Sequence, residues 1–156
     1  MAFKFKSSGT KFTDPVVANA TAPKLPIGIK TPMSLGDNRS GIFSMNFELR
    51  DQVEDNLRNL LLTNYGERLG KFDFGANLRS LVSEVTSGED FESRAMNQIQ
   101  DSVTKYMPYV SLESFGVEFD KNPPKGMAVA NIRMQYTVQQ AGIFSKSISV
   151  KIYAVG

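Results

Sequence analysis

The sequence contains no cysteine, no histidine and no tryptophan. Without cysteine the chain can form neither a disulfide bond nor a reactive thiolate. The joint absence of cysteine and histidine excludes the usual zinc sites, and the absence of histidine excludes a serine–histidine–aspartate relay. Any catalysis would therefore depend on carboxylate, lysine, tyrosine or serine side chains, and we expect no metal ion and no cofactor.

Long apolar runs are also absent. No stretch approaches the ~20 apolar residues that cross a bilayer, so we expect no membrane-spanning segment and no membrane partner. Residues 1–6 read Met-Ala-Phe-Lys-Phe-Lys and lack the apolar stretch of a secretory signal. The absence of cysteine suits a reducing compartment, which favours synthesis and assembly in a cytoplasm.

Acidic side chains are missing from the C-terminal part of the chain. Residues 121–156 hold five basic and no acidic side chains, residues 41–120 hold seven and fourteen, and residues 1–40 hold six and two. This distribution indicates either ordinary solubility or a bipolar molecule that docks opposite charges in an ordered assembly. The basic ends lack arginine clusters with interleaved aromatic residues, so nucleic acid is not an expected partner.

Residues 1–40 have the composition of an extended N-terminal arm. Prolines at positions 23, 26 and 32 disfavour a helix and bias the preceding residues toward extended conformations. We expect the arm to become ordered on a partner surface, where its apolar residues would dock: Phe3, Phe5, Phe12, Leu25, Ile27 and Ile29. A simple tether is the alternative.

The first clear helix is predicted from about Asn46, as the N-cap, to Thr63. Its apolar residues recur at helical spacing: Leu49, Val53, Leu57, Leu60 and Leu61. Charged residues are predicted to cover the opposite, solvent-facing side: Arg50, Asp51, Glu54, Asp55 and Arg58.

Two further helices are predicted after a glycine-rich loop. A short helix begins near Asn77, whose side chain can cap it, and a longer one spans about Asp90 to Met107 before Pro108. The apolar positions of the longer helix are Phe91, Ala95, Ile99, Val103 and Tyr106.

The remainder of the chain reads as strands. Apolar residues alternate over 110–119, with a change of parity beside Gly116 that suggests a bulge, and again over 132–138 and 148–154. The last two runs predict an antiparallel hairpin. The fold class is therefore α+β, with three helices on a small, mainly antiparallel C-terminal sheet. The chain divides into the arm, 1–40, and one domain, 41–156.

An ordered combination of motifs lies between the first two helices. Residues 60–68 read Leu-Leu-Leu-Thr-Asn-Tyr-Gly-Glu-Arg, and residues 72–81 read Phe-Asp-Phe-Gly-Ala-Asn-Leu-Arg-Ser-Leu. Over about residues 42–119 this order resembles the baseplate wedge and sheath-initiator proteins of contractile-tailed phages and related injection systems. Many members of that family follow the short helix with Glu-Pro and a nearby Arg; here Val85 follows Glu84.

The resemblance implies a structural protein and not an enzyme. It implies a platform in the virion's tail baseplate on which sheath assembly begins, assembled in the host cytoplasm. The expected partners are the tail sheath protein, other wedge subunits and the central tail tube, with six copies per baseplate. Arg68, Asp73 and Glu84 are candidate contacts in the loop and short helix, Glu84 being carried over from the family.

A second candidate surface is the last strand, where a partner's extended arm could add a strand to the sheet edge. Residues 147–155 contain no proline and only Lys151 as an interior charge, so Ser147, Ser149 and Lys151 are candidate contacts. The alternative is that this strand is internal and that the open edge lies at 110–119.

Two other functions remain open from the residues. Some members of the family have carried a lysozyme label, and a glycoside hydrolase would need two carboxyls, for which Glu67, Asp73 and Glu84 are candidates. The absence of tryptophan for sugar stacking weighs against it. An adaptor that binds nucleic acid or protein through the basic segment after Lys121 is the third reading.

Overall fold

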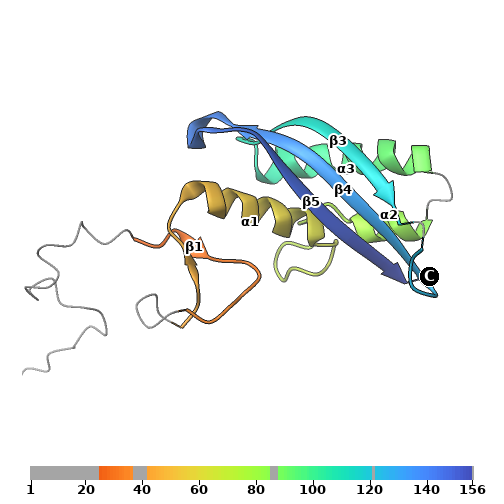
Figure 1. Cartoon of the computed structure of the whole chain (residues 1–156), viewed down its shortest axis with the longest axis horizontal. Coiled ribbons are helices and arrows are strands. Elements are labelled where there is room, and N and C mark those ends of the chain that lie inside the picture. Colours follow the sequence, from red (N-terminus) through yellow and green to blue (C-terminus); the bar gives the residue numbers. More distant parts are fainter. Residues whose placement is uncertain (1–24, 37–41, 85–87, 121, 156) are drawn as a thin grey trace, which may run out of the picture.

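The computed structural model describes residues 25–36, 42–84, 88–120 and 122–155. Helices α1 (Leu49–Leu62), α2 (Leu78–Glu84) and α3 (Gly88–Tyr106) lie on one face of a sheet formed by β3 (Ser111–Phe119), β4 (Met127–Val138) and β5 (Ile143–Val155) (Figure 1). A separate pair of short strands, β1 (Gly28–Ile29) and β2 (Met45–Asn46), precedes α1. The predicted α+β class is confirmed.

The core is a single apolar layer between the helices and the sheet. Most of the residues predicted at helical spacing on α1 and α3 are buried: Val53, Leu57, Leu60, Leu61, Phe91, Ala95, Ile99 and Val103. Leu49, in the first turn of α1, is instead 48% exposed, and Tyr106 is half-buried. The buried helix residues meet the alternate residues of β4 and β5, which are also buried: Ala130, Ile132, Met134, Tyr136, Ile148, Val150 and Ile152. Of the side chains on the opposite face, Val129 is buried and Asn131 and Thr137 are half-buried, but the others are mostly exposed, so the sheet has one largely open face.

The sheet has the order β3-β4-β5 and is antiparallel throughout. The predicted hairpin is confirmed, with Met134 opposite Ile148, although β5 begins at Ile143, earlier than the run at 148 indicates. The expected bulge lies elsewhere than predicted: the register shifts between Leu112 and Ser114. The side chain of the extra residue, Glu113, accepts hydrogen bonds from Thr137 and Ser145 and so holds all three strands together.

Asn46 is not the N-cap of α1, which corrects the sequence prediction. The N-cap position is Glu48, and Asn46 is a buried residue of β2 whose side chain donates to Asp55 at 2.8 Å. Asp55 was predicted on the solvent-facing side of the helix, yet it is only 7% exposed. The two errors have one cause: residues 25–36 cover this side of α1, which periodicity within the helix cannot reveal.

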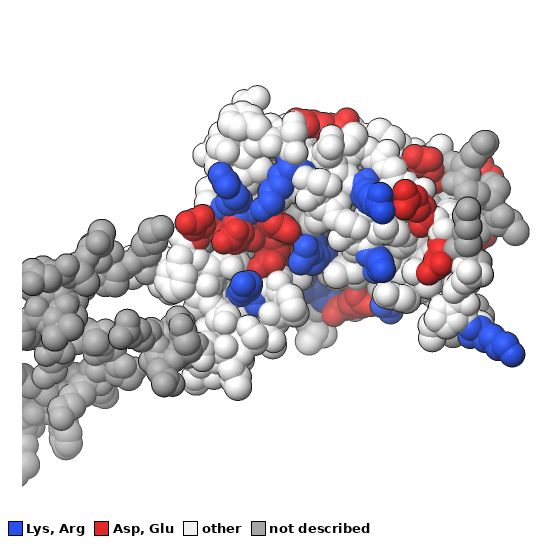
Figure 2. Space-filling view, in the orientation of Figure 1, with Lys and Arg blue, Asp and Glu red and all other residues white. Residues whose placement is uncertain are grey.

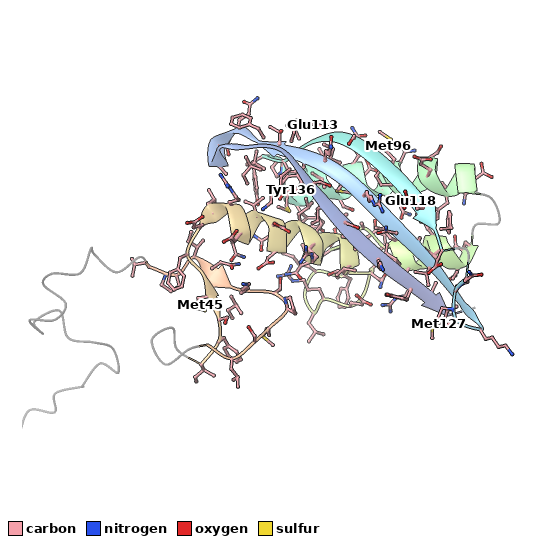
Figure 3. All side chains as sticks on the ribbon, in the orientation of Figure 1. Met45, Met96, Glu113, Glu118, Met127 and Tyr136 are labelled. Carbon is pink, nitrogen blue, oxygen red and sulfur yellow. The ribbon has the colours of Figure 1, made fainter. Side chains whose placement is uncertain are left out.

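Residues 25–36 and 42–47 form a small hairpin-like layer against the start of α1. β1 pairs with β2 antiparallel, and a second bridge joins Leu35 and Phe43. The N–H of Thr31 donates to Asp55 at 2.9 Å, which ties this layer to the helix. Met45 of this layer and Met127 at the start of β4 lie toward opposite ends of the molecule (Figure 3). The rest of the expected arm, residues 1–24 and 37–40, lies outside the described residues.

Candidate functional site

The loop that carries the family-like motifs is built around one close backbone contact. The N–H groups of Ala76 and Asn77 donate to the carbonyls of Leu60 and Thr63, at 3.0 and 3.3 Å. Gly75 has φ +117°, and a Cβ on it would lie 2.1 Å from the carbonyl oxygen of Thr63. Only glycine fits here, so the Asp-Phe-Gly motif has a structural reason.

Arg68 and Asp73 both lie near the aromatic pair that Phe74 of this loop forms with Tyr106 of α3. The Arg68 guanidinium stacks over the Phe74 ring, 4.3 Å from its centroid, and that ring meets Tyr106 of α3 edge to face at 4.9 Å. Asp73 forms an ion pair with Lys105, and the hydrogen bond from this lysine lowers the pKa of the Asp73 carboxyl. The structure therefore brings these two predicted residues together at the C-terminal end of α3.

Glu84 does not join them. It is the last residue of α2 and is exposed, four residues before α3 begins at Gly88. Asp73 pairs with Lys105 near the other end of α3, and a helix of 19 residues spans about 27 Å. The loop and the end of the short helix are thus two separate surfaces.

The carboxyls of the hydrolase alternative lack the environment of a general acid. Such an acid needs a raised pKa, which burial in an apolar pocket provides. Hydrogen bonds from the side chain and backbone N–H of Asn64, both 2.8 Å, lower the pKa of Glu67 instead, and the pKa of Asp73 is lowered by Lys105. Both side chains are exposed, as is Glu84.

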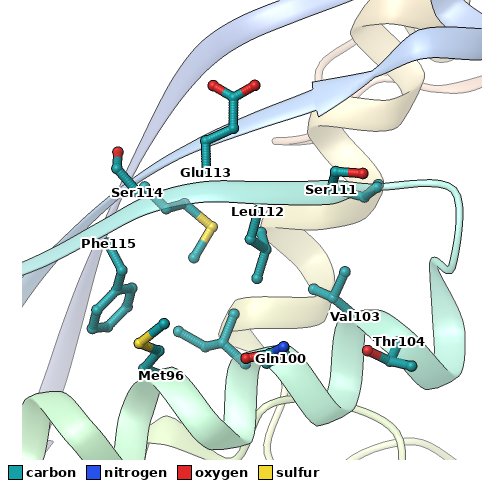
Figure 4. A pocket seen from close by; sticks show the side chains of 12 residues that line it. Met96, Gln100, Val103, Thr104, Ser111, Leu112, Glu113, Ser114 and Phe115 are labelled. Carbon is teal, nitrogen blue, oxygen red and sulfur yellow. The ribbon is translucent and has the colours of Figure 1, made fainter.

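An apolar cavity of about 400 Å³ lies elsewhere, between α3 and β3. Met96, Val103, Leu112 and Phe115 line it, and the only ionisable residue at its border, Glu113, points away from it (Figure 4). The carboxylate of Glu113 is occupied by the hydroxyls of Thr137 and Ser145. The side chains that line this cavity therefore provide no general acid or base.

The segregated charges of the sequence are mixed in the fold. Basic residues of the C-terminal strands pair with acidic residues of the middle segment: Arg133 with Glu118 at 3.2 Å and Lys146 with Glu54. Figure 2 shows basic and acidic side chains next to one another on the face that it presents. Lys151 is different, since it forms no ion pair with any residue that the structure describes.

One hydrogen bond at the end of the β3–β4 ladder shows which residues of β4 direct their backbone N–H and C=O groups toward β3. The N–H of Asp120 donates to the carbonyl of Val129 at 3.0 Å. Hydrogen-bonded pairs alternate with non-bonded pairs along an antiparallel ladder. Val129, Asn131 and Arg133 therefore turn their backbone groups toward β3, and the residues between them turn theirs toward β5.

This alternation identifies the free backbone groups of β5. The residues of β5 opposite Ala130, Ile132 and Met134 are bonded to β4, namely Ile152, Val150 and Ile148. The intervening residues turn their N–H and C=O groups away from the sheet: Ser147, Ser149, Lys151 and Tyr153. Their side chains are exposed on the open face, where the Ser149 hydroxyl donates to Asn131 at 2.8 Å.

Strand β5 is thus an edge strand in the sheet as described, not an internal one. Strand β3 is the other edge, and by the same alternation its outward groups belong to Phe115, Val117 and Phe119. The side chains of these residues face the helices, and the Phe119 ring lies 5.1 Å from that of Phe91 in α3. Both edges considered from the sequence therefore exist, but only β5 presents outward backbone groups beside small polar side chains.

Sequence reasoning missed two residues beside the β5 edge. Arg79 of α2 and Tyr153 of β5 line one small hollow together with Asn64, at the C-terminal end of α1. Arg79 belongs to the Leu-Arg-x-Leu motif, so a signal was present, but its proximity to β5 depends on how α2 packs under the sheet. Within the residues described, no helix is long and apolar enough to cross a membrane, and no group of acidic side chains could hold a metal ion.

Comparison with solved structures places this fold among known ones. A chain of the baseplate of the anti-feeding prophage has a TM-score of 0.57 at 17% identity, covering 70% of this chain and 82% of that chain. A protein from Geobacter sulfurreducens described as a "putative tail lysozyme" has a TM-score of 0.50 at 18% identity, covering 68% and 89%. These likenesses concern the fold alone, and no curated protein matches the chain.

A comparison with protein families is more specific. The family described as "Baseplate wedge protein gp25" matches residues 48–142, from the start of α1 to the turn before β5. The match includes the loop, α2, α3 and the first two strands of the sheet, and so extends beyond the motifs that suggested the resemblance. The chain belongs to the baseplate wedge protein gp25 family, structural components of the baseplates of contractile injection systems.

Proposed function

We propose that this wedge protein is the platform on which the tail sheath begins to assemble, and that β5 accepts an added strand from a sheath subunit. The observation that carries the proposal is the row of outward backbone groups at Ser147, Ser149, Lys151 and Tyr153. Unpaired edge groups favour pairing with another chain, and natural edges are usually blocked by proline, bulges or charge. This stretch has one charge and no proline.

The binding free energy of one added strand is modest, so a stable platform needs several copies of this protein. An added strand that makes four to six backbone hydrogen bonds, at ~0.5–1.5 kcal/mol net each, would contribute several kcal/mol per subunit. Ordering the incoming segment costs part of that gain, so a ring of copies around the tail tube provides the firm surface. Six copies, with other wedge subunits and the tube as neighbours, belong to this proposal.

The experiment replaces Ser149 by Pro. Because the Ser149 N–H faces outward, proline removes a docking donor without removing a bond between β4 and β5. The variant is expected to fold, to join the baseplate and to fail to nucleate sheath, measured by electron microscopy of baseplates mixed with sheath protein. Ser149→Ala keeps the N–H and should nucleate normally.

Val150→Pro is the matched structural control, since the N–H of Val150 is directed at β4. It is expected to destabilise the isolated protein, whereas Ser149→Pro changes the melting temperature little. Unfolding of Ser149→Pro itself would show that the backbone orientation is wrong. A folded Ser149→Pro variant that nucleates sheath as well as the wild type would exclude β5 as the docking strand.

A further inference from the structure

The C-terminal half of the β5 edge is flanked by a hollow on each face of the sheet. On the helix side a hollow of about 100 Å³ is lined by Leu62, Asn64 and Arg79. On the open face a wider one, about 660 Å³, is lined by residues that include Phe119, Val129 and Pro124. Lys151 and Tyr153 border both hollows. The side chains of a strand added at this edge would point alternately to the two faces of the sheet, and each face offers a hollow to accept them.

The hollow on the helix side presents the Arg79 cation, whose ion pair with Glu67 is long. The nearest carboxylate oxygen, that of Glu67, lies 3.9 Å from the Arg79 guanidinium, which is too far for a hydrogen bond. Glu67 is held instead by the side chain and backbone N–H of Asn64, both at 2.8 Å. The Arg79 side chain remains 60% exposed, and Leu62 beside it is 44% exposed. A carboxylate on a short aliphatic stem fits this combination.

The hollow on the open face is different in character. Its acidic residues are already engaged, Glu118 with Arg133 and Asp120 with the backbone N–H of Asn122. The Tyr153 ring is 52% exposed there, whereas the Phe119 side chain faces the helices and packs edge to face on Phe91. Apolar or aromatic side chains would cover this Tyr153 ring, and Lys151 at the margin adds a second cation rather than an acid.

We propose that the strand added to β5 carries an acidic side chain toward Arg79, flanked by apolar or aromatic side chains on the open face. This inference rests on the proposed function and specifies its partner. Because side chains alternate across a strand, the acid and its apolar neighbours are adjacent in the partner's sequence. Arg79 and Lys151 would repel a basic strand, so the site also discriminates against basic partners.

The test uses four short peptides, each capped at both ends, with threonine and valine in alternation. Three differ only at one central position, which is Glu, Gln or Lys, and the fourth is the Glu peptide with one central proline. Binding to the full-length protein is followed by NMR shifts of the 147–153 amides. The Glu peptide is expected to bind about two- to fivefold more tightly than the Gln peptide, the range for an exposed ion pair, and the Lys peptide most weakly.

Two variants change this preference in opposite directions. Arg79→Gln should abolish the difference between the Glu and Gln peptides, and Glu67→Gln, which removes the competing carboxylate, should enlarge it. The proline peptide should bind neither variant nor wild type if the peptide adds as a strand.

The outcomes separate this inference from the proposed function. Equal binding of the Glu, Gln and Lys peptides, or a preference that persists in Arg79→Gln, overturns the inference that the added strand carries an acid toward Arg79. Either result leaves the addition of a strand to β5 intact. Absence of shifts at the 147–153 amides with every peptide overturns the inference as well. The proposed function is judged independently, by whether Ser149→Pro baseplates nucleate sheath.

Discussion

Replacing Asp55 by Ala is expected to release residues 25–36 from α1 while the domain stays folded. The carboxylate accepts hydrogen bonds from the N–H of Thr31 at 2.9 Å and from the side chain of Asn46 at 2.8 Å. Bonds to a charged group contribute about 1.5–3 kcal/mol each. The freed donors can reach water once the segment detaches, so we expect a loss of about 2–4 kcal/mol for the two together.

The loss should be local, because the rest of the layer has little stability of its own. β1 and β2 are two residues each, and an isolated two-stranded hairpin is marginal in water. Amide hydrogen exchange at Ile27 and Lys30, which donate to the carbonyls of Asn46 and Ser44, should therefore become about 30-fold faster or more. Exchange in α3 and β4 should stay unchanged.

The same contact predicts a pH dependence. Burial alone would raise the pKa of Asp55, but the hydrogen bonds from Thr31 and Asn46 outweigh it and the pKa is lowered. A carboxyl whose pKa is lower in the folded state contributes stability that is fully present above its ordinary pKa of about 4 and is lost as the pH falls through the lowered pKa. Protection of Ile27 and Lys30 should decline in that acid range in the wild type and be insensitive to pH in Asp55→Ala.

Asp51→Ala is the control, since Asp51 is an exposed acid of the same helix. It should leave exchange at Ile27 and Lys30 unchanged. Equal protection of these amides in wild type and Asp55→Ala would refute the reasoning.

Limited proteolysis of the wild-type protein tests the division of the chain at residue 40, which stays a prediction. A stable fragment that begins near residue 25 would move the boundary, and one that begins near residue 41 would support it.

Two further predictions concern the motif loop and the short helix. Gly75→Ala should destabilise the domain by about 2 kcal/mol or more, because the new methyl group meets the Thr63 carbonyl and φ is +117°; a melting temperature within a degree of wild type would contradict the close contact. Glu84→Ala should leave stability within ~0.5 kcal/mol, since the side chain is exposed, while incorporation into the wedge falls; normal yields of assembled baseplates would remove Glu84 from the proposed contacts.

The local elements of this protein were determined by the sequence alone. The positions of α1 and α3 follow from apolar residues at helical spacing, and the β4–β5 hairpin follows from strict alternation. These patterns record which face of each element is buried. The loop motif was recognisable by its resemblance to a known family, and the structure adds the reason that only glycine fits at position 75.

The tertiary structure decided what each polar residue does. Asn46 is a plausible cap and Asp55 a plausible surface acid until residues 25–36 cover them, and this contact joins residues 24 positions apart. The bulge lies at Glu113 and not beside Gly116, because Thr137 of β4 and Ser145 of β5 hold that carboxylate. The outward row on β5 and its proximity to Arg79 likewise depend on strand order and helix placement, which result from long-range packing and leave no periodic trace in the chain.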